Sequence, residues 1–313
     1  MNFFPAVLQR YITKIRAFFR TKKGRYLVRV SKHFFNGALI CIILFQIYKI
    51  GVTDVLKSFP VNPLFYLIFI VIFLTLPFSE FLIYKRFVPL KLLESQRIFH
   101  IKRVYNKVFI GYSGEVYLFA WLKKQYKRTT KEVFEFVRDN NTISIIASWI
   151  VVAGLSGWLL ITDETGLVSK VQEEIRLFLA LIFVLIVVFV ILASVFRRKL
   201  YTLNYKDSST IFSVHTIRTV FLAILQMLQW YVVIPMAGFK LLFNFVAIQM
   251  VIGKIPFVPN KELIFISLSI YLAQFIELPL EQFTSLLIIN LILEKLFGLS
   301  FLLLYRKSFS NHP

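Results

Sequence analysis

One stretch of the chain, from Ser58 to Ser79, reads SFPVNPLFYLIFIVIFLTLPFS and contains no aspartate, glutamate, lysine or arginine. A bilayer core about 30 Å thick requires roughly 20 apolar residues in a crossing helix, so this stretch predicts a membrane-spanning helix. Five further segments predict crossings: 33–48, 140–162, 177–196, 219–239 and 283–305. The segment 33–48 is shorter but is flanked by lysines, and the segment 283–305 contains Glu294 and Lys295.

The composition of the whole chain supports this interpretation. Of its 313 residues, 58% are hydrophobic and 17% are charged, and its mean hydropathy is +0.72. Soluble domains are about 45–50% apolar and about 25% charged, and a globule of this size could not bury so much apolar surface. The composition therefore excludes a soluble enzyme, a disordered chain and a disulfide scaffold. It predicts an all-α, polytopic helical bundle in a membrane.

The charge distribution predicts the topology. The chain has 37 lysines and arginines against 16 acids, and the basic residues punctuate the apolar runs, which is typical of cytoplasmic membrane loops rather than of a nucleic-acid partner. Residues 1–33 hold nine basic residues and no acid, so we expect a cytoplasmic N-terminal arm that is attracted to anionic lipid headgroups. A single transmembrane domain, 34–305, and a cytoplasmic tail, 306–313, follow.

Two segments are apolar but interrupted, and each is expected to enter the membrane and return on the same side. The segment 104–122 contains glycines and a glutamate and has basic clusters on both flanks, which places both of its ends inside. The segment 241–276 splits at 253–262 into two pieces too short to cross. The sequence thus predicts about six full spans plus two re-entrant or broken-helix segments.

This layout relates the two halves of the domain. The halves 34–161 and 177–305 each read as span, span, dip, span, but the first begins inside and the second outside. They are candidates for an inverted repeat, an arrangement that recurs in alternating-access carriers. The alternative is that any odd-numbered unit repeated twice looks inverted.

Several polar residues are expected at membrane depth, where each charge costs about 2.5–3.5 kcal/mol on insertion scales. Glu80 could be an interfacial carboxylate paired with a nearby basic residue, and Glu294 could pair with Arg218. Amides such as Asn290 are expected to form hydrogen bonds between helices. The membrane-embedded polar residues are therefore Glu80, Arg218, Asn290, Glu294 and Lys295.

No constellation of soluble-enzyme residues is present, so no catalytic residue and no cofactor are expected. The chain lacks a nucleophile elbow and a P-loop. Its four histidines have no metal-ligand spacing, and the single cysteine, Cys41, cannot form an internal disulfide. We therefore expect that the protein is not an enzyme.

Three short motifs carry a resemblance to a known family. Gly114-Glu115 is followed by apolar residues and then by Lys123-Lys124; a second motif runs from Pro256 through Pro259-Asn260-Lys261; and Pro279-Leu-Glu281-Gln282 comes after it. With these motifs, residues 35–305 resemble the flippase-like integral membrane proteins whose best-known relatives form the membrane domain of bacterial lysylphosphatidylglycerol synthase/flippases. The chain departs from the pattern at Gly111, where no proline precedes Gly-Glu, and at Asn260-Lys261, which replaces Gly-Gly.

The resemblance implies that a phospholipid or glycolipid headgroup moves between the leaflets of a bacterial inner membrane, with both termini in the cytoplasm. The two dips would meet at a polar cavity, and the assembly would be compatible with a homo-oligomer or with a membrane enzyme as partner. The alternative function is a non-transporting partner or regulator of a lipid-modifying enzyme or envelope glycosyltransferase. The candidate substrate-binding residues are Gly111, Ser113, Gly114, Glu115, Pro256, Pro259, Asn260 and Lys261.

Overall fold

The computed structural model describes residues 21–108, 113–161, 202–255, 260–276 and 278–310, together with isolated positions between 177 and 191. Every regular element in these ranges is helical, as expected. The α-helices are α2 (Lys22–Ile50), α3 (Val52–Lys57), α4 (Pro63–Tyr84), α5 (Leu92–Val108), α6 (Ser113–Gln125), α7 (Thr130–Ile161), α10 (Tyr205–Val233), α11 (Gly238–Lys254), α12 (Lys261–Ala273) and α13 (Leu280–Ser310), and a short 3-10 helix, η1 (Pro235–Ala237), precedes α11.

Five helical stretches are long and apolar enough to cross a membrane, which confirms a membrane-type helical bundle. The apolar part of α2, Asn36–Ile50, is shorter than these five. Most of the span expected at 177–196, and residues 1–20 of the arm expected at 1–33, lie outside the described residues; the rest of the arm, from Lys22 on, forms the start of α2. The number of six spans therefore stays a prediction. The five stretches are Pro63–Tyr84, Thr130–Trp158, Tyr205–Val233, Pro235–Lys254 and Leu280–Phe301.

The chain between α10 and α11 differs from the sequence prediction. A span over 219–239 was expected, but α10 ends at Val233, because Pro235 begins a 3-10 turn and Gly238 adopts a left-handed φ of 68°. The apolar run that follows is therefore longer than the 13-residue piece expected from 241 onward. Together, η1 and α11 are long enough to cross, with Lys240 in the first turn of α11.

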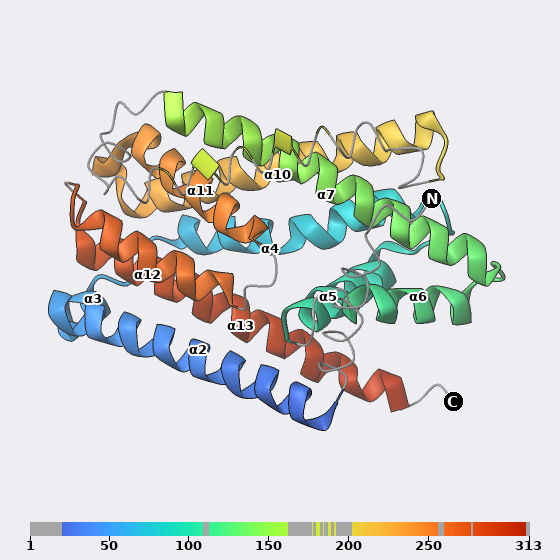
Figure 1. The fold of residues 1–313 in the computed structure, drawn as a ribbon, viewed down its shortest axis with the longest axis horizontal. Coiled ribbons are helices and arrows are strands. Elements are labelled where there is room, and N and C mark those ends of the chain that lie inside the picture. The colour runs from blue at the N-terminus through green and yellow to red at the C-terminus, as the bar shows by residue number, and fades with distance from the viewer. Residues whose placement is uncertain are drawn as a thin grey trace, which may run out of the picture.

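Both expected interruptions coincide with helix ends. Helix α5 ends at Val108 and α6 begins at Ser113, while α11 ends at Lys254 and α12 begins at Lys261. Figure 1 shows α5 and α6 near the end of the bundle where α4 ends and α7 begins, and α11 and α12 in the opposite half. The start of α2 and the end of α13 lie toward the α5–α6 end. The α5–α6 pair and the α11–α12 pair thus lie toward opposite ends of the bundle.

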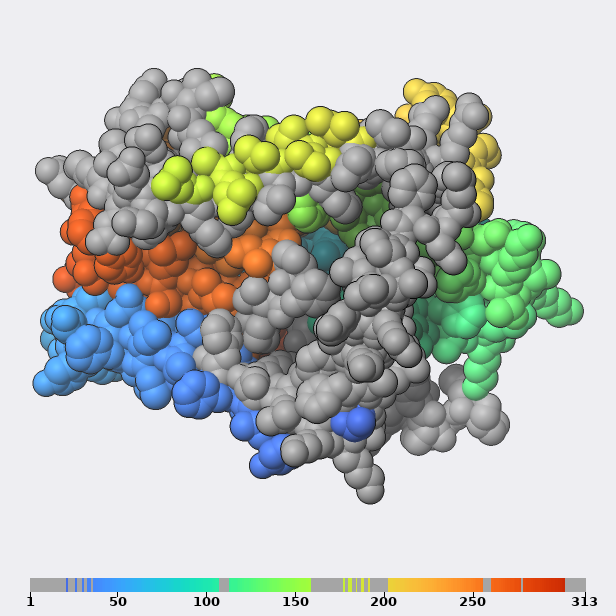
Figure 2. Space-filling view, viewed as in Figure 1, coloured from blue at the N-terminus to red at the C-terminus, as the bar shows by residue number. Residues whose placement is uncertain are grey.

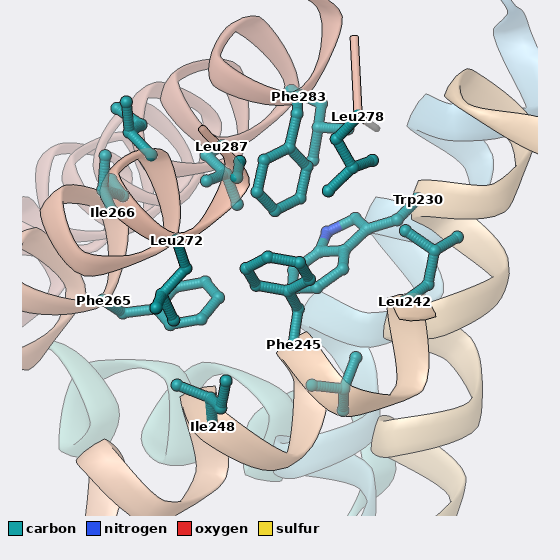
Figure 3. Close-up of a cluster of buried hydrophobic side chains, with 14 of the residues drawn as sticks. Trp230, Leu242, Phe245, Ile248, Phe265, Ile266, Leu272, Leu278, Phe283 and Leu287 are labelled. Atoms are coloured by element: carbon teal, nitrogen blue, oxygen red, sulfur yellow. The ribbon is translucent and has the colours of Figure 1, made fainter. Parts of the chain in front are cut away.

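Each helix pair packs into its own apolar core. Around α11 and α12, the indole of Trp230 stacks on Phe265 with ring centroids 5.9 Å apart and meets Phe283 edge-on (Figure 3). Around α5 and α6, the ring of Tyr84 packs on Phe99 and Phe136. The aromatic side chains therefore fix each pair against the long helices of the bundle.

The outer surface of the bundle is apolar, as a lipid-facing surface must be. Large apolar side chains remain exposed along α4, among them Leu67 at 57% and Phe78 at 47%. Figure 2 shows α2 lying beside α12 on one face, where the amide of Gln46 donates a hydrogen bond to the carbonyl of Ser267. A soluble monomer rarely exposes such contiguous apolar area.

Candidate functional site

A proline in α4 creates the first polar group of the site. Pro77 lies inside the helix and has no N–H, so the carbonyl oxygen of Phe73, four residues earlier, loses its helical donor. The guanidinium of Arg103 on α5 donates a hydrogen bond to this carbonyl at 3.2 Å and lies over the Phe73 ring. An arginine from a second helix thus satisfies a backbone group that would otherwise be orphaned within the bundle.

The same arginine forms an ion pair that joins α5 to α13. A second guanidinium nitrogen of Arg103 donates to the carboxylate of Glu294, and the two side chains are only 17% and 21% exposed. The pairing of Glu294 with Arg218 that the sequence suggested is not formed. Lys295, the neighbour of Glu294, instead pairs with Glu262 on α12 at 3.0 Å. Each charge of the adjacent pair therefore finds its own partner on a different helix.

A chain of amides continues from this ion pair into the bundle. The Gln226 amide donates to Gln229 on α10, and the Gln229 amide donates to Asn290 on α13 at 3.0 Å and to the carbonyl of Phe65. Two amide groups have unused capacity: within the described residues, the Nδ2 of Asn290 and the side chain of Gln249 have no hydrogen-bond partner. The unpaired Nδ2 of Asn290 indicates a hydrated or ligand-binding space, because buried polar atoms are normally paired, and the partly exposed amide of Gln249 adds hydrogen-bonding capacity.

These groups line one cavity of about 270 Å³ between α4, α5, α10, α11, α12 and α13. One water takes about 30 Å³ of liquid volume, so the cavity has room for a cluster of waters or a small polar headgroup. Its walls alternate between polar groups and apolar side chains, as small-molecule sites do. The polar lining consists of Arg103, Gln226, Gln229, Gln249, Glu262, Asn290 and Glu294, and the apolar lining of Phe69, Ile72, Phe73, Trp230, Phe265, Ile266, Leu287 and Leu291.

A second polar cluster holds α5 and α6 together. The buried ammonium of Lys102 lies 3.0 Å from a carboxylate oxygen of Glu80 on α4 and 3.5 Å from one of Glu115 on α6. The Asn106 amide donates to Glu115 and accepts from the backbone N–H of Gly114. Glu80 and Glu115 are thus joined through a lysine that the sequence placed in a cytoplasmic loop.

Gly114 sets the distance between the two helices of this pair. A Cβ at this position would lie 2.1 Å from the carbonyl oxygen of Lys102 and 2.9 Å from Oδ1 of Asn106. Only glycine lets α6 approach α5 this closely. Ser113 beside it donates to the carbonyl of Tyr105 at 2.7 Å. The residues of the Gly-Glu motif therefore serve the contact between α5 and α6.

The residues of the second motif that the structure describes lie at the other helix pair. Asn260 adopts a left-handed φ of 45° just before α12, and the ammonium of Lys261 donates to the carbonyl of Gly253 at the end of α11. Neither residue lines the cavity, and neither do Ser113, Gly114 and Glu115. Three further candidates of the two motifs, Gly111, Pro256 and Pro259, lie outside the described residues.

Two residues lie at sites where the sequence did not predict them: Arg103 lines the cavity, and Lys102 belongs to the second cluster. Lys102 and Arg103 were interpreted as loop charges flanking a dip, but both lie in α5 and are paired with carboxylates. A signal was present: Pro77 leaves a free carbonyl within a charge-free run, and such a carbonyl requires a donor from another helix. The helix that would supply this donor could not be read from the sequence.

The described residues contain no group of three histidine, cysteine, aspartate or glutamate side chains that could hold a metal ion. Scanning the chain against protein-family models gives no match, and comparison with curated proteins and with solved structures gives none either. The resemblance to the flippase-like proteins therefore stays a prediction from the motifs.

Proposed function

We propose that this protein is an integral membrane translocase that moves the polar headgroup of a lipid or glycolipid between leaflets, and that the cavity is the place where the headgroup is held. The observation that carries the proposal is a partly polar cavity with an unpaired amide, lined by the shorter helices α5 and α12 and by four helices, α4, α10, α11 and α13, that lie in stretches long and apolar enough to cross a membrane. A headgroup that crosses bare hydrocarbon loses its hydration, and a polar cavity lowers that barrier.

The chemistry of the lining favours a neutral headgroup rich in hydroxyl groups. The two carboxylates that line the cavity are both paired, Glu294 with Arg103 and Glu262 with Lys295, so the cavity offers little net charge to a charged headgroup. The amides of Gln249 and Asn290 can both donate to and accept from hydroxyl groups. Trp230 and Phe265 supply apolar ring surface beside them. Sugar and glycerol headgroups match this combination of amides and aromatic rings.

Lipid movement in proteoliposomes tests the proposal. The purified protein is reconstituted with fluorescent glycolipid, phosphatidylglycerol or phosphatidylcholine, and the fraction accessible to an external quencher is followed in time. In the variant Gln249→Leu/Asn290→Leu, two hydrogen bonds worth about 1 kcal/mol each are lost, so glycolipid movement should slow roughly tenfold or more. Gln274→Leu, which removes an exposed amide at the end of α12, is the matched control and should leave the rate unchanged.

The outcomes separate this proposal from its alternative. Equal glycolipid rates in wild type and the double variant would refute the assignment of the cavity. A wild-type protein that accelerates no lipid, yet is isolated with a membrane glycosyltransferase or another lipid-modifying enzyme, would favour a non-transporting partner. A preference for phosphatidylglycerol over glycolipid would refute the chemical class assigned to the headgroup.

A further inference from the structure

A second group of cations lies outside the cavity, at the junction of α4, α7 and α10. The guanidinium of Arg218 on α10 donates to the hydroxyl groups of Ser79 on α4 and Ser144 on α7, at 3.4 Å each. Within the described residues, no carboxylate lies within ion-pair distance of this arginine. Glu80 is near enough to interact with it electrostatically, but its carboxylate pairs with Lys102.

A lysine reaches the same face of α7 from α11. The ammonium of Lys254 donates to the hydroxyl of Ser148 at 2.7 Å, and it too has no carboxylate partner within the described residues. Ser144 and Ser148 are four residues apart on one helix, so their side chains lie about 6 Å from each other. The two cations are therefore held side by side along a ladder of serines, and Arg218, Ser144 and Lys254 all remain partly exposed.

The serines cannot neutralise these cations. The hydroxyl of Ser79 already donates to the carbonyl of Leu76, and that of Ser148 donates to the carbonyl of Ile145, so each offers its cation only a neutral acceptor. A charge removed from water costs several kcal/mol unless an opposite charge compensates it. Arg218 and Lys254 therefore supply the positive charge and the hydrogen-bond donors that an anion-binding site requires.

The charges at this junction identify the class of anion. Glu80 and Glu115 pair with Lys102, whereas Arg218 and Lys254 have no carboxylate partner within the described residues and Lys261 adds a further cation near Lys254, so positive charge is in excess here. A phosphodiester carries one negative charge and oxygen acceptors that match a guanidinium and an ammonium. An anion of this kind would offset part of this excess charge.

We infer that Arg218 and Lys254, supported by Ser79, Ser144 and Ser148, form a binding site for a phosphate group. A phosphodiester in a lipid headgroup and free inorganic phosphate share this chemistry. The site is distinct from the cavity, which none of these five residues lines, and it does not depend on translocation. It gives the protein a phosphate-binding function that can be measured by binding alone.

Binding to the full chain in a phosphate-free detergent tests this site. Phosphatidylglycerol, diacylglycerol and inorganic phosphate are titrated separately while the thermal midpoint is recorded, and lipid retention is measured by native mass spectrometry. We expect phosphatidylglycerol or inorganic phosphate to raise the midpoint of the wild type and diacylglycerol to leave it unchanged. Arg218→Gln and Lys254→Gln should each lower the affinity for the compound that raises the wild-type midpoint at least tenfold, because each removes charge-assisted hydrogen bonds. Lys206→Gln, which removes an exposed charge from the same helix as Arg218, is the matched control.

Each outcome decides the inference. A response to phosphatidylglycerol alone assigns the site to a lipid headgroup, and a response to inorganic phosphate assigns it to a free anion. A response that is the same in wild type and both variants overturns the inference, as does a wild type that responds to neither phosphate compound or that responds equally to diacylglycerol. Arg218→Lys keeps the charge and should retain binding, which separates loss of the site from failure to fold.

The unliganded proteins provide an independent check. If Arg218 only braces the helices, Arg218→Gln should lower the thermal midpoint without ligand and leave the ligand response unchanged. If Arg218 is instead a cation that no carboxylate compensates, the neutral variant should be at least as stable as wild type without ligand and should lose the response.

Discussion

Gly114 controls the contact between α5 and α6, and Gly114→Ala is therefore a direct test of the packing. The added Cβ would lie 2.1 Å from the carbonyl oxygen of Lys102, whereas ordinary contact begins at 3.4 Å, so the helices must separate locally by about 1.3 Å. The obstacle is backbone, which no side-chain rotation can remove. The same displacement lengthens the 2.7 Å hydrogen bond from the Gly114 N–H to Asn106.

The expected cost follows from these two effects. Overpacking of a close contact costs about 1–3 kcal/mol, and weakening one hydrogen bond adds about 1 kcal/mol. We therefore expect Gly114→Ala to lose about 2–4 kcal/mol of stability. At about 2–4 °C per kcal/mol, the thermal midpoint in detergent should fall by roughly 5–15 °C. The assay is a thermal unfolding curve of the purified full chain, followed by intrinsic tryptophan fluorescence.

Gly154→Ala in α7 is the matched control. A Cβ there has no atom within 4 Å, and alanine is favoured over glycine in a helix interior by up to about 1 kcal/mol. Its midpoint should therefore be unchanged or slightly raised. Adding Asn106→Ala to Gly114→Ala should not restore stability, because the Lys102 carbonyl still obstructs the Cβ. A Gly114→Ala protein as stable as wild type would refute the close approach of the two helices.

Three further substitutions probe other features. Arg103→Met should destabilise the protein by about 2–4 kcal/mol in the same thermal assay, because it removes a cation that pairs with the partly buried carboxylate of Glu294. Adding Glu294→Leu should recover most of that loss, and an additive loss would contradict the ion pair. Pro77→Ala restores an N–H for the carbonyl of Phe73, so we expect a thermal midpoint equal to or above that of wild type and slower amide hydrogen exchange around residue 77. A large loss of stability would show that the proline is needed for packing. Asn260→Gly should raise stability by up to about 1 kcal/mol, because glycine adopts the left-handed conformation without strain, and a lower midpoint would mean that the side chain makes a needed contact.

The interruptions in the apolar pattern illustrate what local chemistry can specify. The glycines and polar residues between 104 and 122, and the charged, proline-containing stretch at 253–262, disfavour continuous apolar helices, and the structure ends helices at both places. The chain after α10 was harder to predict. Lys240 looked like the end of a membrane segment, but Pro235 ends α10 earlier, and the lysine is accommodated in the first turn of α11.

The sequence by itself determined that this chain is an apolar helical bundle with broken segments, because helix length, apolar content and helix breakers act over a few neighbouring residues. Only the tertiary structure decided which polar groups meet. Arg103 and Glu294 are 191 residues apart, and their pairing depends on α5 lying beside α13 and on the carbonyl that Pro77 leaves free. Every buried charge needs some partner, but the sequence does not specify which one, because the partner depends on how distant helices pack.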